Sequence, residues 1–289
     1  MRKVAGIGES ILDVIFRDGQ PQKAVVGGSV LNCMISLSRS GIPAIFISEL
    51  GNDRVGRLMK NFMQENRLNT DYIYVFDEGA SPVSLAFLDK DGNAEYQFFT
   101  DYPEKRLQTK FPVLERDSVL VLGSYFAVNP KLRPRVRELL LQARENKAII
   151  YYDINFRKAH AAEAEALAPV FAENFEFADI VRCSDEDLAI IEKYLKPNCK
   201  NFILTCGKNP ISLWTPHITK EYAVEPVEPV STIGAGDNFN AGIVYGIFRE
   251  NIGREALDNL PEPLWDKLIE YGKRFATAVC LSEENYISY

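Results

Sequence analysis

The stretch Ser231-Thr232-Ile233-Gly234-Ala235-Gly236-Asp237-Asn238-Phe239-Asn240-Ala241-Gly242 is the most distinctive part of the sequence. A run of small residues leads here into an apolar pattern with helical spacing, which predicts a loop that opens a helix. The first turn of a helix carries unpaired N–H donors and the positive end of the helix dipole. Because Gly234, Ala235 and Gly236 place no bulky side chain over these donors, the stretch predicts an anion-binding site.

Asp237 falls in the first turn of this predicted helix. Its position has a structural explanation, because the helix dipole stabilises a negative charge there. It also suits a general base, since a carboxylate at this point lies within reach of both the anion site and an incoming hydroxyl. The loop has no lysine of the Walker type, so phosphoryl chemistry here would depend on this carboxylate and on backbone donors.

Outward from the loop, strand-like and helix-like segments alternate along most of the chain. Strands are predicted at 4–8, 44–50, 119–123, 148–153, 179–183 and 201–206, and helices at 30–41, 53–66, 131–145, 161–174 and 185–194. This alternation is typical of βαβ units, so we predict an α/β fold with a mostly parallel central sheet and helices on both faces.

Two segments break the alternation. Residues 11–16 read as a strand with no helix after it, and residues 83–88 can pair with 95–99 across the turn Asp91-Gly92, a strong hairpin signal. We therefore predict a small β-sheet lid, with strands from about residues 9–22 and 80–102. Because no repeat or linker divides the chain, residues 1–289 are predicted to form one domain.

Composition excludes several classes of protein. Asp and Glu exceed Lys and Arg by 40 to 33, so we expect no broad cationic surface and no nucleic acid partner. No apolar run approaches the roughly 18 residues of a membrane helix, and the apolar stretch after Met1-Arg2-Lys3 is too short for a signal peptide. A soluble, cytoplasmic protein without a membrane partner is expected.

Histidine and cysteine are too few and too scattered for several kinds of site. The chain has 2 histidines, which argues against a His-based triad or a multi-histidine metal site. Its 5 cysteines are widely spaced and never form C-x-x-C, so reduced, mostly buried thiols are expected at Cys33, Cys183, Cys199, Cys206 and Cys280.

The 231–242 stretch resembles the D-T-x-G-A-G-D signature of the ribokinase-like (PfkB-type) carbohydrate kinases, and the likeness covers nearly the whole chain. Gly27-Gly28-Ser29-Val30-Leu31-Asn32 is similar to that family's G-G-x-x-x-N sugar-binding element, and residues 51–56 resemble its G-x-D-x-x-G turn. Residues 153–157 are similar to the D-x-N-x-R segment of its fructokinase and ketodeoxygluconate kinase branches. Thr205-Cys206-Gly207-Lys208 resembles its T-x-G turn near the nucleotide.

The resemblance implies a ribokinase-like three-layer core in which ATP phosphorylates a sugar hydroxyl at the carboxyl ends of the parallel strands. Asp237 would act as general base, and Gly234, Ala235 and Gly236 would form the anion hole. The implied sugar-binding residues are Asp13, Gly27, Gly28, Asn32, Asn155 and Arg157. The implied nucleotide-binding residues are Thr205, Gly207, Thr232, Gly234 and Gly236. Mg²⁺ would be held mainly by the ATP phosphates, with Glu186 or Asp187 reached through water.

Several of these residues also have structural interpretations. Asp13 could be an outward polar position of a strand, and Gly27-Gly28 could be a turn before a helix with Ser29 as its N-cap. Asn155 and Arg157 could cap the next helix or pair on the surface. For Glu186 and Asp187, the charge preference of a helix N-terminus is sufficient, and Ser184 stands where the family often has an asparagine.

Two residues of the signature depart from the family pattern. Ser231 replaces its usual leading aspartate, and Ile233 replaces its usual central threonine, which removes hard oxygen ligands for a potassium-like ion. We therefore predict no activation by monovalent cations. The segment after residue 281 is short, so the adenine pocket is either incomplete or finished by Tyr286 and Ile287.

Within the kinase class, fructose is the favoured substrate, and ribose, ketodeoxygluconate and nucleosides remain alternatives. A second hypothesis is a non-catalytic sugar or nucleotide sensor with the same fold. A nicotinamide-dependent oxidoreductase is suggested only by Gly6-Ile7-Gly8, and that fingerprint fails because residue 11 is isoleucine. The apolar lid residues Val83, Leu85 and Phe87 lead us to expect a homodimer joined through the lids.

Overall fold

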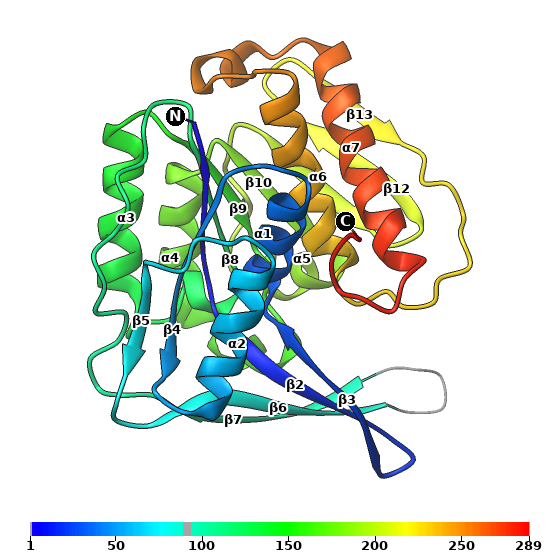
Figure 1. The fold of residues 1–289 in the computed structure, drawn as a ribbon. Helices are drawn as coiled ribbons and strands as arrows, with labels where there is room; N and C mark the ends of the chain where they lie inside the picture. The colour runs from blue at the N-terminus through cyan, green and yellow to red at the C-terminus, as the bar shows by residue number, and fades with distance from the viewer. Residues whose placement is uncertain (1, 89–93, 289) are drawn as a thin grey trace.

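The computed structural model describes residues 2–88 and 94–288, which form two β-sheets and the helices that cover the larger one (Figure 1). The larger sheet contains β1 (Val4–Ile7), β4 (Ala44–Gly51), β5 (Ile73–Phe76), β8 (Val119–Gly123), β9 (Ile149–Asp153), β10 (Ile180–Ser184), β11 (Phe202–Cys206), β12 (Asn209–Trp214) and β13 (Thr219–Tyr222). The helices are α1 (Ser29–Arg39), α2 (Arg54–Glu65), α3 (Arg133–Glu145), α4 (Ala164–Phe177), α5 (Asp185–Ile191), α6 (Ala235–Arg249) and α7 (Glu262–Cys280).

The larger sheet is parallel except at one edge. Its strand order is β13-β12-β11-β10-β9-β8-β1-β4-β5, and only β12 and β13 run antiparallel to their neighbours. All four residues of β1 are buried, as expected for a strand covered on both faces. The chain leaves β1 toward β4 on one side and returns to β8 on the other. This reversal creates a switch point at the carboxyl ends of the strands, where α/β sheets generally bind ligands.

Two hydrophobic cores lie on opposite faces of this sheet. Apolar residues of α1, α2, α6 and α7 pack on one face, and those of α3, α4 and α5 pack on the other. Helix α1 is buried throughout Val30 to Ser38 and contacts α6 directly, so these two helices form the centre of their layer. The three layers confirm the predicted α/β fold class.

The smaller sheet lies below the carboxyl ends of the central strands in Figure 1. It consists of β2 (Ile11–Arg17), β3 (Gln20–Gly27), β6 (Ala80–Leu88) and β7 (Ala94–Asp101), in the order β3-β2-β6-β7. Strand β3 continues to Gly27, past the limit near residue 22 that the sequence suggested. The end of this edge strand was not predicted, because Pro21 and the exposed polar residues around it are typical of a loop. The predicted turn Asp91-Gly92 lies outside the described residues, and the division into one domain with a lid stays a prediction.

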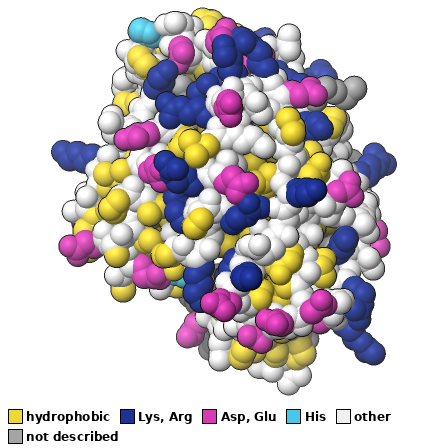
Figure 2. Space-filling view, turned by 90° about the vertical axis from the view of Figure 1, so that its left-hand side faces the viewer, with side chains coloured by type: hydrophobic (Ala, Val, Ile, Leu, Met, Phe, Trp, Pro, Cys, Tyr) yellow, Lys and Arg dark blue, Asp and Glu magenta, His cyan; other side chains and the backbone are white. Residues whose placement is uncertain are grey.

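The other predicted elements occur close to their expected limits. The chain from 158 to 163 forms a 3₁₀ helix before α4 begins, and α5 ends at Ile191. Strand β5, the hairpin β12–β13 and helix α7 were not predicted. In the described parts of the chain, no helix is both long and apolar enough to cross a membrane. On the face shown in Figure 2, basic and acidic side chains are interspersed.

Candidate active site

The predicted anion-binding loop does open a helix, because Gly234 is the N-cap of α6. Gly234 has a φ of 79°, and a Cβ atom there would lie 2.7 Å from the carbonyl oxygen of Asn285. The Asn238 side chain fixes the turn, since its Nδ2 donates to the carbonyl oxygens of Gly234 and Asn285, each at 2.8 Å. The loop is therefore held rigidly with its first backbone N–H groups at a helix N-terminus, which suits an anion.

Asp237 and Asn32 meet in the interior between α6 and α1. Nδ2 of Asn32 donates to Oδ2 of Asp237 at 2.9 Å, although the two residues are far apart in sequence. Burial raises the pKa of Asp237 to about 7, and Asp153 adds to the increase. The hydrogen bond from Asn32 and the charges of Arg157 and Arg182 oppose it. Asp237 therefore has a pKa suited to exchanging a proton near neutral pH.

Asn32 has an unused acceptor beside this carboxylate. Its Oδ1 is buried, and no group in the described residues donates to it. A buried polar atom without a partner is costly, so a ligand hydroxyl that donates to Oδ1 would be favoured here. Gly28, four residues earlier, has a φ of 135°, and a Cβ atom there would lie 2.3 Å from the carbonyl oxygen of Glu9. Only glycine fits at this position, which brings the start of α1 close to the end of β1.

Asp13 projects from the small sheet toward the same region. Its carboxylate accepts a hydrogen bond from the Ser84 hydroxyl on the neighbouring strand, and burial raises its pKa. Oδ2 of Asp13 would lie 2.9 Å from a Cβ atom on Gly27, so the glycine leaves this oxygen open. Asp13 and Gly27 are therefore adjacent, as sugar-binding residues on a lid would be.

Sequence reasoning missed Arg182, which lies at the centre of the site. Its Nη1 donates to Oδ1 of Asp153 at 3.1 Å, and its Nη2 donates to the Thr205 hydroxyl. Nδ2 of Asn240, on α6, donates to the other Asp153 oxygen at 2.7 Å. The guanidinium lies against Gly236 of the anion loop. Arg182 therefore joins the anion loop to the carboxyl ends of β9 and β11. The sequence signal that could have identified it is a single charged residue within a strand that is otherwise apolar and buried.

The predicted nucleotide residues divide into two groups. Thr205 is tied to the anion loop through Arg182, and Gly207 follows at an exposed turn with a φ of 58° and open space around it. Thr232 is exposed, and its carbonyl oxygen accepts from the Ala235 N–H at 3.2 Å. Thr205 and Gly207 therefore border the site, whereas Thr232 lies at its solvent-exposed rim.

Asn155 and Arg157 follow β9 at the carboxyl edge of the sheet. Asn155 is buried with a φ of 36°, a left-handed conformation that is costly for a residue other than glycine and tends to occur at functional sites. Arg157 is exposed, and its charge acts on Asp237 and on Asp187. Arg157 is thus a cation at the edge of the site, close enough to lower the pKa of the Asp237 carboxyl.

The predicted metal contacts are limited to one buried carboxylate. Asp187 is buried in the first turn of α5, where the Ser184 hydroxyl is 2.6 Å from its Oδ2 and caps the helix. Glu186 is exposed. No cluster of three or more metal-ligating side chains occurs within residues 2–88 and 94–288. This donor set fits Mg²⁺, which typically keeps water and phosphate ligands and takes only one or two carboxylates from protein.

One structural alternative raised by the sequence does not hold. Ser29 is not the N-cap of α1, because Gly28 occupies that position and Ser29 is already helical. The expected role of Tyr286 and Ile287 in an adenine pocket stays a prediction. The Tyr286 ring packs against Phe62 of α2, and Ile287 donates its N–H to the Ser36 hydroxyl of α1 at 3.1 Å. Both residues therefore pack on α1 and α2.

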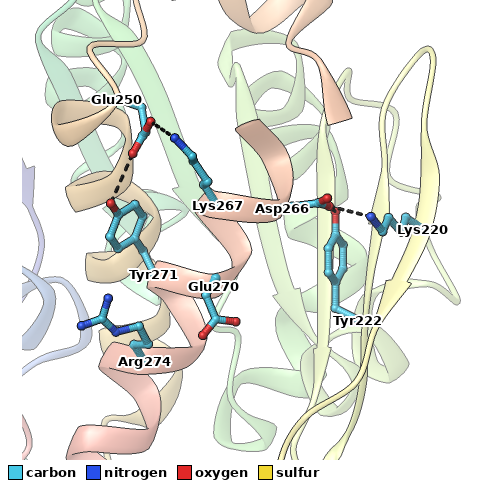
Figure 3. A pocket seen from close by; sticks show the side chains of 8 residues that line it. All are labelled: Lys220, Tyr222, Glu250, Asp266, Lys267, Glu270, Tyr271 and Arg274. Atoms are coloured by element: carbon cyan, nitrogen blue, oxygen red, sulfur yellow. Dashed lines mark hydrogen bonds and ion pairs between the residues drawn. The ribbon is translucent and has the colours of Figure 1, made fainter. Parts of the chain in front are cut away.

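An open hollow of about 650 Å³ lies over α7, away from the anion loop. Figure 3 shows two ion pairs among its charged side chains. Lys267 bonds to Glu250 at 2.6 Å, and Lys220 bonds to Asp266 at 2.7 Å. It contains none of the predicted site residues, so we do not assign the chemistry to it.

Comparison with known proteins identifies the family. The model of the pfkB family carbohydrate kinases matches residues 1–284. The chain belongs to this family. A fructokinase of Rhizobium leguminosarum bv. trifolii is 26% identical to this pfkB family member over 282 residues, which cover 89% of this chain and 86% of the relative. The prediction of an ATP-dependent carbohydrate kinase is confirmed by this membership.

Solved structures of related kinases share the fold. Aminoimidazole riboside kinase from Salmonella enterica, complexed with aminoimidazole riboside and an ATP analog, has a TM-score of 0.82 at 18% identity, covering 98% of this chain and 94% of that one. Fructokinase from Vibrio cholerae O395, in a form with fructose, ADP and calcium ion bound, has a TM-score of 0.79 at 19% identity, covering 99% and 94%. The predicted ribokinase-like architecture is therefore confirmed.

Proposed function

We propose that this pfkB family member transfers the γ-phosphoryl group of ATP to a hydroxyl of a sugar, with fructose as the favoured substrate. The observation that carries the proposal is the pair Asp237 and Asn32, bonded at 2.9 Å in the interior beside the glycine-rich N-terminus of α6. A carboxylate with a pKa of about 7 next to an anion site has the properties that a general base for phosphoryl transfer requires.

In the reaction, the sugar hydroxyl donates its proton to the Asp237 carboxylate. The hydroxyl oxygen forms a bond to the γ-phosphorus of ATP, the bond from that phosphorus to the β–γ bridging oxygen breaks, and ADP leaves. The N–H groups at Gly234, Ala235 and Gly236 would stabilise the charge on the transferring group without rearranging. Mg²⁺ bound with the phosphates would offset their negative charge, and Asp187 would contact it through water.

On the acceptor side, the sugar would lie between the small sheet and α1. Asp13 can accept from one hydroxyl and Asn32 Oδ1 from another. Gly27 would allow the sugar to approach the backbone, and Gly28 would act by letting the start of α1 pack against Glu9. Asn155 and Arg157 would line the opposite end, and the small sheet would exclude water that could compete as acceptor.

Fructose is favoured because the family relatives include fructokinases and because residues 153–157 and the run Ser184-Asp185-Glu186-Asp187 resemble those of fructokinases. Ribose, ketodeoxygluconate and nucleosides remain alternatives. A carboxylate substrate such as ketodeoxygluconate would need a cation, and the exposed Arg157 would supply it.

The test is ATP consumption with Mg²⁺ and a panel of sugars and nucleosides, comparing the wild type with Asp237→Asn. We expect a sugar-dependent rate that falls by about 10² to 10⁴ in the variant, the usual effect of losing a positioned base. Glu165→Gln is a matched control, because Glu165 also lies in the first turn of a helix but is exposed. Equal rates for Asp237→Asn and the wild type would overturn the proposed role.

The alternative is a sensor that binds a sugar or nucleotide without turnover, motivated by Ser231 and Ile233 in the signature. It predicts that no member of the panel is phosphorylated, while a sugar or nucleotide still raises the melting temperature by binding the folded state. The buried Asp237 with its raised pKa favours the kinase hypothesis. Burying an ionisable group costs free energy of folding, and a sensor would gain nothing from that cost.

A further inference from the structure

The segment that follows α7 folds back toward the site and is pinned on both sides of Asn285. Before it, Glu284 forms an ion pair with Arg39 at 2.7 Å. After it, the Tyr286 side chain is buried against Phe62, and the Ile287 N–H is bonded to α1. These contacts fix residues 284–287 on α1 and α2, so the position of Asn285 does not depend on its own side chain.

The backbone of Asn285 also touches the anion loop. Its carbonyl oxygen accepts from Nδ2 of Asn238 at 2.8 Å and lies 2.7 Å from where a Cβ atom on Gly234 would be. These are main-chain contacts, which any residue at position 285 could keep. Substitution of the side chain should therefore leave the anion loop and the segment in place.

The Asn285 side chain projects toward the predicted sugar-binding residues. It lines a small hollow between the small sheet and the anion loop, together with Asp13, Ile15, Val25, Ala86, Leu88, Tyr96 and Ile233. Its Nδ2 would lie 4.0 Å from a Cβ atom on Gly27, and Oδ2 of Asp13 would lie 2.9 Å from the same atom. The amide and the carboxylate therefore converge on Gly27.

This amide has no structural partner. Among the residues that the structure describes, no hydrogen bond to the Asn285 side chain occurs, although its neighbours on both sides are bonded. The hollow is about 40 Å³, which is room for only a few water molecules, so a sugar enters only if the small sheet moves outward. The amide would then face the sugar beside Asp13.

We propose that Asn285 is a specificity-determining residue of the acceptor site, whose amide hydrogen-bonds a hydroxyl of a neutral sugar beside the one held by Asp13. This inference rests on the proposed function of the same site. A carboxamide both donates and accepts, so it suits a hydroxyl and gives no charge compensation to a carboxylate substrate. The apolar Ile233 in the same wall would contact a carbon of the sugar.

The experiment compares Asn285→Ala and Asn285→Asp with the wild type on the preferred sugar and on its series of monodeoxy analogues. Glu283→Gln is the matched control, because Glu283 is exposed on the same segment two residues away. We expect Asn285→Ala to raise KM for the sugar about 10-fold, the scale of a hydrogen bond to one hydroxyl, with kcat and KM for ATP within about 3-fold of wild type.

The deoxy series supplies the decisive readout. For one analogue, removal of the hydroxyl should weaken binding to the wild type but not to Asn285→Ala. The variant already lacks the amide that bonds this hydroxyl, so the two changes form a double-mutant cycle and are non-additive. The inference is wrong if every analogue loses affinity by the same factor with the wild type and with Asn285→Ala. It is also wrong if Asn285→Ala does not change KM for the sugar. An ADP-induced rise in melting temperature, measured on each variant, shows that it is folded.

The same samples separate this inference from the proposed function. If the wild type binds a sugar in a thermal-shift assay without phosphorylating any, the kinase proposal fails. The role of Asn285 then survives only if its substitution abolishes the sugar-induced shift. If the wild type is an active kinase and the variants match it on every sugar, Asn285 fails while the kinase proposal stands.

Discussion

The Arg182 guanidinium lies so close to Gly236 that a Cβ atom at residue 236 would stand 2.8 Å from Nη2. The glycine is therefore required for contact with a buried cation as well as for access of an anion to the helix N-terminus. Because the same guanidinium is bonded to Asp153 and Thr205, its displacement would disturb the loop and the nucleotide turn together.

We expect Gly236→Ala to lower kcat/KM for ATP by at least about 10-fold, since one displaced charged hydrogen bond accounts for a factor of this size. The check is a double-mutant cycle with Arg182→Lys, whose slimmer side chain leaves room for the methyl group. The two substitutions should be non-additive, with the double variant more active than the product of the single effects. Strict additivity would show that Gly236 and Arg182 act independently.

A second expectation concerns pH. Asp237 must be ionised to accept a proton, and its pKa is raised to about 7 by burial, with a further contribution from Asp153. We therefore expect kcat/KM to fall as the pH decreases through about 7. The bond from Asn32 lowers this pKa, so Asn32→Ala should move the acidic limb of the profile to higher pH. Rate profiles from pH 5 to 9 would show this, and an unchanged limb in Asn32→Ala would contradict it.

The same raised pKa has a consequence for stability. A carboxyl group whose folded-state pKa exceeds its unfolded value, about 3.9, binds its proton more tightly in the folded protein. Its contribution to stability is fully present below pH 4 and is lost as the pH rises through about 7. Asp237→Asn, which cannot ionise, should therefore melt at a higher temperature than the wild type at pH 8, and the difference should shrink toward pH 5. Glu165→Gln should show no such trend.

The sequence predicted the elements that depend on local pattern. Strands such as Val119–Gly123 are continuous apolar runs, and the Gly234–Asp237 loop has few alternatives to a helix start. The sequence also predicted that Asn32 and Asp237 belong to one site, because both lie in motifs with a defined place in the family fold. These inferences needed only local chemistry and the order of motifs along the chain.

What the sequence did not supply depends on tertiary packing. Asn285 reaches the site because Tyr286 is buried on α2 and Glu284 pairs with α1, and neither contact has a local signature. Strand β3 has a polar edge pattern that resembles a loop. Arg182 could have been noticed as a charge within a buried strand, but its partners lie on other strands and on α6.

A fourth expectation is that potassium does not activate the enzyme. The Ser231 hydroxyl oxygen already accepts from the Ile233 N–H at 3.2 Å, and Ile233 offers no side-chain oxygen. Hard monovalent cations need several oxygen ligands, and these two substitutions remove them from the loop. Replacing sodium by potassium at constant ionic strength should leave kcat within about 2-fold, a change of less than 0.5 kcal/mol. A several-fold increase would mean that backbone carbonyl groups alone form the site.

The last expectation is a homodimer joined through the small sheets. Leu85, Phe87 and Phe99 lie on the face that points away from Asp13, where Phe87 is 39% and Phe99 49% exposed. The Phe87 ring stacks on Phe16 with centroids 5.0 Å apart, so the exposed surface is apolar and ordered. An apolar sheet face with open edges favours association with a second copy.

Sedimentation at micromolar protein should therefore give the mass of a dimer, and Phe87→Glu should give a monomer, because burying an unpaired carboxylate in the interface is costly. Val113→Glu is the matched control, since Val113 is 67% exposed and lies outside the small sheet. A wild-type monomer, or a dimer unaffected by Phe87→Glu, would exclude this face as the interface. If the dimer forms, loss of sugar turnover in the Phe87→Glu monomer would show that the second copy also helps to hold the small sheet over the acceptor site.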